Sequence, residues 1–150
     1  MALGKRVDPL PVSSFHLDIS GKCQGTFREC SGLGSESEVI EHKASARSGQ
    51  VIVHKIPGNL KYENIILKRG VTDDMQIWDW RKMVEDGKVD EARMNGTITM
   101  YDQMNMPMAE WTFDNAWPVK VGGPTLNAGT NEIAVEELQI AHEGMRRNKV

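Results

Sequence analysis

The chain has 150 residues, of which 39% are hydrophobic, enough for one globular domain to bury its own core. Its formal net charge of −3 argues against a dedicated nucleic-acid-binding surface, which normally shows as a basic patch or stripe. No apolar run approaches the roughly 18 residues of a membrane span, and residues 1–12 lack the apolar stretch of a signal peptide. We therefore expect a protein made in the cytoplasm, with an arm over 1–12, one domain over 13–145 and a tail over 146–150.

The first predicted element is a strand. Phe15, Leu17 and Ile19 alternate with polar neighbours, at the period of two that half-buried strands show. A turn at residues 20–22 is expected to lead into a returning strand over residues 26–30.

A long hairpin is predicted next. Residues 37–42 form a strand candidate, and an extended pattern resumes over residues 51–56. Residues 43–50 between them are small and polar, so this tip is predicted to be flexible and to add nothing to the core. Because hairpin loops of this length are often functional or disordered, the hairpin is a candidate contact arm. Pro57 and Gly58 are predicted to form a turn after it.

One α-helix is predicted at about residues 73–86, after a strand over residues 62–69. Asp73 is expected to cap its start, with Gln76 three positions on completing a capping-box-like pair. Gly87 is well placed to end it. The side chains expected to pack this helix against a sheet are Ile77, Trp78, Trp80 and Val84.

A second hairpin is predicted from residues 95–101 and 108–117, joined across residues 102–107. Its second arm alternates between an apolar and a polar face, the pattern of an antiparallel sheet with one wet face. The apolar residues are Ala109, Trp111 and Phe113, and the polar residues are Glu110, Thr112 and Asp114. Pro118 is predicted to end the strand.

Residues 132–143 give conflicting signals. Their richness in Ala, Glu, Leu and Gln favours a helix. Two apolar pairs nevertheless alternate with polar residues, with a slip of phase at Glu136 and Glu137 that fits a strand with a β-bulge. The alternating apolar residues are Ile133, Val135, Leu138 and Ile140. The residues alone leave helix and strand open.

No constellation of residues indicates catalysis, a cofactor or a metal. The chain has no HExxH, CxxC or GxSxG motif, and its four histidines are scattered. Met104, Met106 and Met108 resemble a thioether site for Cu(I), but packing of a flexible loop is the preferred interpretation. Cys23 and Cys30 are too few for a disulfide framework and are predicted to be reduced. We expect no enzyme, no cofactor and no metal site.

Three segments, in order, carry a resemblance to a known family. FHLDISGKCQGTFRECSGLGSESEVIEHK, with its turn at residues 31–33, resembles the opening of the inner tube proteins of contractile tails. IPGNLKYENIILKRGVTDD, followed by Trp78, resembles their centre, and NAWPVKVGGPTLNAGTNEIAVEELQIAHEG resembles their C-terminal third. The segments cover roughly residues 13–145. The resemblance is to the T4-like tail tube family, which includes subunits of phages and of phage-derived contractile injection systems.

The resemblance implies a mainly β (α+β) fold, a small antiparallel β-barrel or sandwich with one flanking helix and a long hairpin loop. It assigns residues 132–143 to a strand. It further implies hexameric rings that stack into a hollow tube, with partners in a contractile sheath, a baseplate or spike and a terminal cap. The lumen would hold effector cargo or a tape-measure protein, with no stable nucleic-acid binding and no membrane insertion by this subunit.

The resemblance places contacts between neighbouring subunits on the loop over residues 42–56. The expected contact residues are His42, Lys43, Ser45, Arg47, Gln50, Val51, Val53, His54 and Ile56. The polar residues Glu110, Thr112 and Asp114 are candidates to face the lumen. The expected function is that of an inner tube subunit in an injection particle, released or membrane-docked. The alternatives are the tail tube of a contractile-tailed phage, which conducts DNA, and a secreted ring-forming or ligand-binding barrel.

Overall fold

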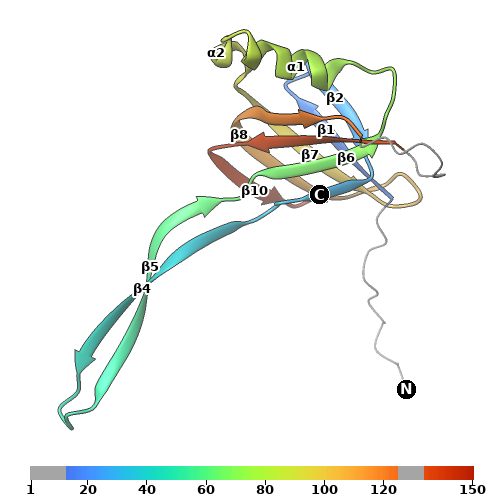
Figure 1. Cartoon of the computed structure of the whole chain (residues 1–150). Coiled ribbons are helices and arrows are strands. Elements are labelled where there is room, and N and C mark those ends of the chain that lie inside the picture. The colour runs from blue at the N-terminus through green and yellow to red at the C-terminus, as the bar shows by residue number, and fades with distance from the viewer. Residues whose placement is uncertain (1–12, 125–133) are drawn as a thin grey trace, which may run out of the picture.

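The computed structural model describes residues 13–124 and 134–150 (Figure 1). These residues form mostly antiparallel strands with two short helices. In chain order the elements are β1 (Ser14–Ile19), β2 (Cys23–Phe27), β3 (Glu29–Ser31), β4 (Ser35–Ser45), β5 (Val51–Tyr62), β6 (Ile65–Gly70), α1 (Gln76–Glu85), α2 (Val89–Ala92), β7 (Met94–Tyr101), β8 (Pro107–Gly122), β9 (Val135–Ala141) and β10 (Gly144–Asn148). The predicted mainly β fold is confirmed.

One strongly curved sheet forms the body of the protein. Its strands follow the order β2-β1-β7-β8-β9-β6-β3, and β10 pairs with β8. The end strands β2 and β3 are consecutive in the chain, and only Arg28 separates them. Within the described residues β2 pairs with β1 and β3 pairs with β6, so the sheet curls around the core without closing into a continuous barrel.

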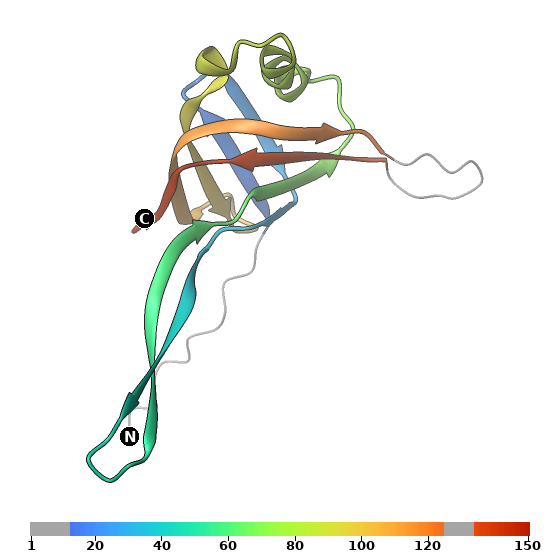
Figure 2. The same ribbon diagram turned by 60° about the vertical axis from the view of Figure 1, so that its left-hand side comes forward.

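The core lies inside this curl, under α1. Its largest fully buried side chains come from six strands and the helix. They include Leu17, Ile19, Phe27, Ile65, Leu67, Ile77, Ile98, Phe113, Leu138 and Ile140. Helices α1 and α2 lie along one side of the sheet, and the β4–β5 hairpin projects away from the other side (Figures 1 and 2).

Helix α1 begins later than predicted. The residue before its first turn is Met75, and no side chain caps the helix, so Asp73 as its cap is wrong. Asp74 instead accepts the Gln76 N–H at 3.0 Å, within a turn that precedes the helix. The Gln76 side chain is not part of a capping box, because its Oε1 accepts the N–H of Gln24 at 2.8 Å and ties the helix to β2.

The end of α1 is as predicted. Gly87 has a φ of +82°, and its N–H donates to the Val84 carbonyl at 3.0 Å while the Lys88 N–H donates to that of Met83 at 2.8 Å. This pair of bonds is a Schellman motif, in which glycine adopts the left-handed conformation without steric cost. The chain then forms α2, which the sequence did not predict.

Two prolines expected to interrupt strands lie inside them. Pro118 was predicted to end its strand, but β8 continues to Gly122, and the pairing with β9 shifts register just after the proline. Pro57 was predicted to turn the chain, but it lies within β5, next to a register shift at which β5 has one residue more than β4. Proline has no N–H to donate, and such irregularities are where strands tolerate it.

Residues 135–141 form a strand, which confirms the interpretation that the family resemblance favoured. The predicted bulge at Glu136 and Glu137 is wrong, because β9 pairs with β6 in one unbroken register from Ile140 to Val135. Glu136 faces the core together with Leu138 and Ile140, and only 2% of its surface is exposed. The alternation of apolar residues is interrupted at this point because a buried carboxylate, that of Glu136, takes a core-facing position. Residues 132 and 133 lie outside the described residues.

Candidate assembly surface

The β4–β5 hairpin forms a separate two-stranded sheet that stands away from the body (Figure 2). The predicted loop over residues 43–50 is shorter in the structure, because strand pairing continues to Ser45 and Val51. The turn itself is closed by the Ala46 N–H, which donates to the Gln50 carbonyl at 2.8 Å. None of the β4 or β5 residues is buried, and none of residues 46–50 between them is, so the prediction that the tip over residues 43–50 adds nothing to the core is confirmed.

The hairpin is apolar for a surface element. Most of the exposed large hydrophobic side chains among the described residues lie on it. They are Val39, Ile40, Val51, Ile52, Val53, Ile56 and Leu60. A contiguous exposed apolar patch marks an interaction site, and a strand pair with free outer edges invites further pairing.

The register divides the outer hairpin between two faces, because directly opposed residues point to the same side and successive residues alternate. We define the apolar hairpin face as the pairs Ile40–Ile56, His42–His54 and Ala44–Ile52. We define the mixed hairpin face as Val39–Pro57, Glu41–Lys55, Lys43–Val53 and Ser45–Val51. The apolar face carries no ionised carboxylate or ammonium group, whereas the mixed face carries Glu41, Lys43 and Lys55. The apolar face is therefore the better candidate for a docking surface.

The predicted contact residues are distributed over both faces. His42, His54 and Ile56 belong to the apolar face. Lys43, Ser45, Val51 and Val53 belong to the mixed face. Arg47 and Gln50 lie in the turn. The prediction did not include Ile40 and Ile52, each of which has an apolar valine beside it in the sequence.

The hairpin meets the body beside His142. The His142 ring centroid lies 5.4 Å from that of Tyr62, the last residue of β5, and 6.0 Å from that of Phe113 in the core. Neither ring nitrogen has a hydrogen-bond partner among the described residues. Burial lowers the pKa of His142 below its usual value, with neighbouring backbone groups of Glu63 and Gly144 opposing the effect. Burial of this ring therefore favours its neutral form.

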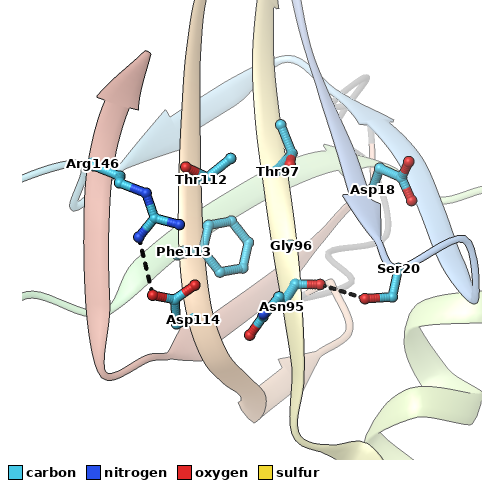
Figure 3. A pocket seen from close by; sticks show the side chains of 9 residues that line it. All are labelled: Asp18, Ser20, Asn95, Gly96, Thr97, Thr112, Phe113, Asp114 and Arg146. Atoms are coloured by element: carbon cyan, nitrogen blue, oxygen red, sulfur yellow. Dashed lines mark hydrogen bonds and ion pairs between the residues drawn. The ribbon is translucent and has the colours of Figure 1, made fainter.

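The wet face of the sheet carries the polar residues predicted on β8. Thr112 belongs to a row in register across four strands, Asp18–Thr97–Thr112–Arg146. Asp114 lies beside this row and accepts a hydrogen bond from Arg146 Nη1 at 3.0 Å (Figure 3). Glu110 lies in the next row on this face, opposite Thr99 and Asn148.

The first of these rows and Asp114 help to line a surface pocket, which Figure 3 shows from nearby. Ser20 closes one end of it by donating from its hydroxyl to the Asn95 carbonyl at 2.8 Å. Arg146 was placed in a tail by sequence, but it lies on β10, which carries the sheet to Asn148. The sequence pattern did not indicate β10, because this strand has only five residues and two of them are arginines.

Helix α1 packs through the predicted residues. Ile77 and Trp80 are buried, and Trp78 and Val84 are half-buried against the core. Trp80 Nε1 also donates to the Ala92 carbonyl of α2 at 2.7 Å. This contact connects the two helices.

No group of three or more metal-ligating side chains gathers anywhere in the part of the chain that the structure describes. Both cysteines are free thiols, and burial raises the pKa of each to about 12. Met104 and Met106 are exposed at the β7–β8 connection. The described helices are all too short or too polar to cross a membrane.

The sequence matches the family described as T4-like virus tail tube protein gp19 over residues 11–146. The chain belongs to this tail tube family. Its members, and the similar solved structures, are structural tube proteins rather than enzymes. No curated protein matches the sequence.

Solved structures agree with this fold. A chain of the sheath/tube terminator of the extracellular contractile injection system PVC, in the extended state, is 25% identical, with a TM-score of 0.77. The alignment covers 95% of this chain and 99% of that one. A chain of the anti-feeding prophage tube-terminating cap is 22% identical over 100% of both chains, with a TM-score of 0.79. Hcp1 from Flavobacterium johnsoniae is 14% identical, with 90% and 94% covered and a TM-score of 0.53.

Proposed function

We propose that this chain is the inner tube subunit of a contractile injection system. Its copies form hexameric rings, and the rings stack into a hollow tube through which effector cargo is delivered. The observation that carries the proposal is the family match over residues 11–146, together with likeness over nearly the whole chain to components of two injection systems. Sheath, baseplate and cap proteins are the proposed partners, since similar chains come from complexes of those kinds.

The hairpin supplies the contact between neighbouring subunits. Ile40, Ile52 and Ile56 are between 44% and 53% exposed in the single chain, and covering them stabilises an assembly through the hydrophobic effect. A hairpin that docks on a different surface of the next copy makes a heterologous contact, the kind that builds rings or open helical arrays. The free edges of β4 and β5 are protected in the same step.

The wet face of the sheet is proposed to line the lumen. Its rows contain Asp18, Glu110 and Asp114 against Arg146, so charges of both signs are present and the acidic ones predominate. A surface that is hydrated and weakly acidic does not hold cargo by apolar contact. Cargo can then slide through without being retained.

A second candidate is the tail tube of a contractile-tailed phage, through which DNA passes. The match to a family of virus tail tube proteins favours it. The weakly acidic wet face suits either cargo, because it repels the phosphate backbone of DNA rather than binding it. The contents of purified particles, protein or DNA, distinguish these two functions.

The test compares two triple variants in assembly. Ile40→Ser/Ile52→Ser/Ile56→Ser removes the aliphatic side chains of the apolar hairpin face, and Val39→Ser/Val51→Ser/Val53→Ser is the matched change on the mixed face. All six side chains are exposed, so both variants are expected to fold as monomers. In sedimentation velocity, the first variant should stay monomeric while the second forms the same large species as wild type. Assembly of the first variant at wild-type level would contradict the docking role of the apolar face.

A further inference from the structure

His42 and His54 are directly opposed on the β4–β5 hairpin. Both side chains are exposed. Opposed residues in an antiparallel pair have Cβ atoms about 4.5–5.5 Å apart and point to the same side. Two imidazole side chains therefore project from opposed positions on the same face, between the apolar pairs Ile40–Ile56 and Ala44–Ile52.

This spacing suits one metal ion held by two imidazoles. Zinc binds histidine nitrogen at about 2.0–2.1 Å, so an ion between the rings reaches both when their Cβ atoms are about 5 Å apart. Imidazole is a preferred ligand of Zn²⁺, Ni²⁺ and Cu²⁺, and the neutral ring is the form that binds. We propose that His42 and His54 form a two-histidine site for a divalent transition-metal ion of this class, with water in the remaining coordination positions.

The other soft donors of the chain compete poorly. All four histidines and both cysteines lie within the described residues. Cys23 and Cys30 remain protonated at neutral pH, because burial raises the pKa of each to about 12. The His142 ring is half-buried between Tyr62 and Phe113. His16 faces Thr26 across β1 and β2, with no second histidine opposite it.

A bound ion would cross-link the two strands of the arm. A two-stranded hairpin by itself is marginally stable in water, and this one stands away from the core. An ion that binds the paired hairpin and not the frayed one shifts the equilibrium toward the paired form. The site lies on the apolar hairpin face, but it belongs to the single subunit and does not rest on the proposed tube function.

The test uses the full chain without a polyhistidine tag, dilute enough to remain unassembled, at neutral pH. Zinc chloride is titrated while the ring Cε1–H signals of the histidines are followed by NMR. We expect the His42 and His54 signals to shift together to one saturation point at one zinc per chain. The His16 and His142 signals should stay in place.

Three single variants complete the experiment. His42→Ala and His54→Ala should each weaken zinc binding by at least about tenfold, since even the loss of an outer-shell partner of a metal ligand costs that much. His16→Ala is the matched control and should bind as wild type does. Independent shifts of the His42 and His54 signals, no saturation at millimolar zinc, or unchanged affinity in either hairpin variant would overturn the proposal.

Discussion

The Trp78 indole Nε1 donates a hydrogen bond to the Glu136 carboxylate at 2.9 Å, joining α1 to β9. Arg69 Nη2 lies 3.9 Å from the same carboxylate, and the Arg69 side chain also stacks on Phe27 with 5.1 Å from its Cζ to the ring centroid. Glu136 and Arg69 are 2% and 5% exposed. Through Trp78, helix α1 is thus tied to a buried ion pair between β6 and β9.

Removing this carboxylate should destabilise the subunit strongly. Glu136→Ala leaves the buried Arg69 guanidinium with the partly exposed Asp74 carboxylate, 3.8 Å away, as its counterion, and it leaves the Trp78 N–H without an acceptor. The free energy of unfolding should fall by about 3 kcal/mol, the lower end of the loss on breaking a buried ion pair. Trp78→Phe, which removes one hydrogen bond and part of a ring, should cost about 1–2 kcal/mol. Urea unfolding of dilute, unassembled protein gives both values. Equal losses would contradict the claim that Glu136 contributes more to stability than its hydrogen bond with Trp78 alone.

Gly32 is predicted to be irreplaceable in the turn after β3. Its φ is +81°, and a Cβ there would collide with the Asn64 carbonyl oxygen. Gly49, at the hairpin tip, has a similar φ of +80° but open space around it. Gly49→Ala should therefore cost only the conformational strain, about 1–2 kcal/mol. Gly32→Ala should cost clearly more in urea unfolding, and a smaller loss than for Gly49→Ala would refute the steric argument.

His142 should make stability depend on pH. Its folded pKa is lowered by burial, so near the unfolded pKa the unfolded chain binds more protons than the folded one. The contribution of neutral His142 to the free energy of unfolding is fully present above the unfolded pKa of about 6.5 and is lost as pH falls below it. The Asp114 carboxylate on β8 raises the pKa of His142 and so opposes the effect of burial. His142→Phe should flatten this part of the curve of unfolding free energy against pH, and an unchanged slope would contradict the assignment.

The two cysteines should react slowly while the protein is folded. Burial raises the pKa of both thiols to about 12, and the thiolate is the reactive form. A thiol reagent at mildly alkaline pH should label buried Cys23 only as fast as the chain opens and half-buried Cys30 slowly, and it should label both rapidly in urea. Mass spectrometry after timed quenching measures each site, and rapid labelling of Cys23 in the native protein would contradict its burial.

The sequence predicted those elements whose pattern is local. The β7–β8 hairpin followed from the alternation of Ala109, Trp111 and Phe113 with polar neighbours. The end of α1 followed from Gly87, because a single residue type meets the requirement of a left-handed conformation.

The rest depends on contacts far apart in the chain. The burial of Glu136 could not be predicted from its local sequence, because its partners Arg69 and Trp78 are 67 and 58 residues away in sequence. The length of the β4–β5 hairpin was underestimated because Pro57 is typical of a turn, whereas in the structure a register shift beside it, with one extra residue on β5, accommodates it within the strand. The sequence-based contact set did not include Ile40 and Ile52, two residues of the proposed docking face, since burial in the core is the ordinary expectation for isoleucine.

Electron microscopy of the purified protein tests the central claim most directly. Negatively stained wild-type chain, alone and from cells that produce it, should show hollow rings with sixfold symmetry or stacked tubes of uniform width. Uniformly dispersed monomers in both preparations would contradict a tube subunit.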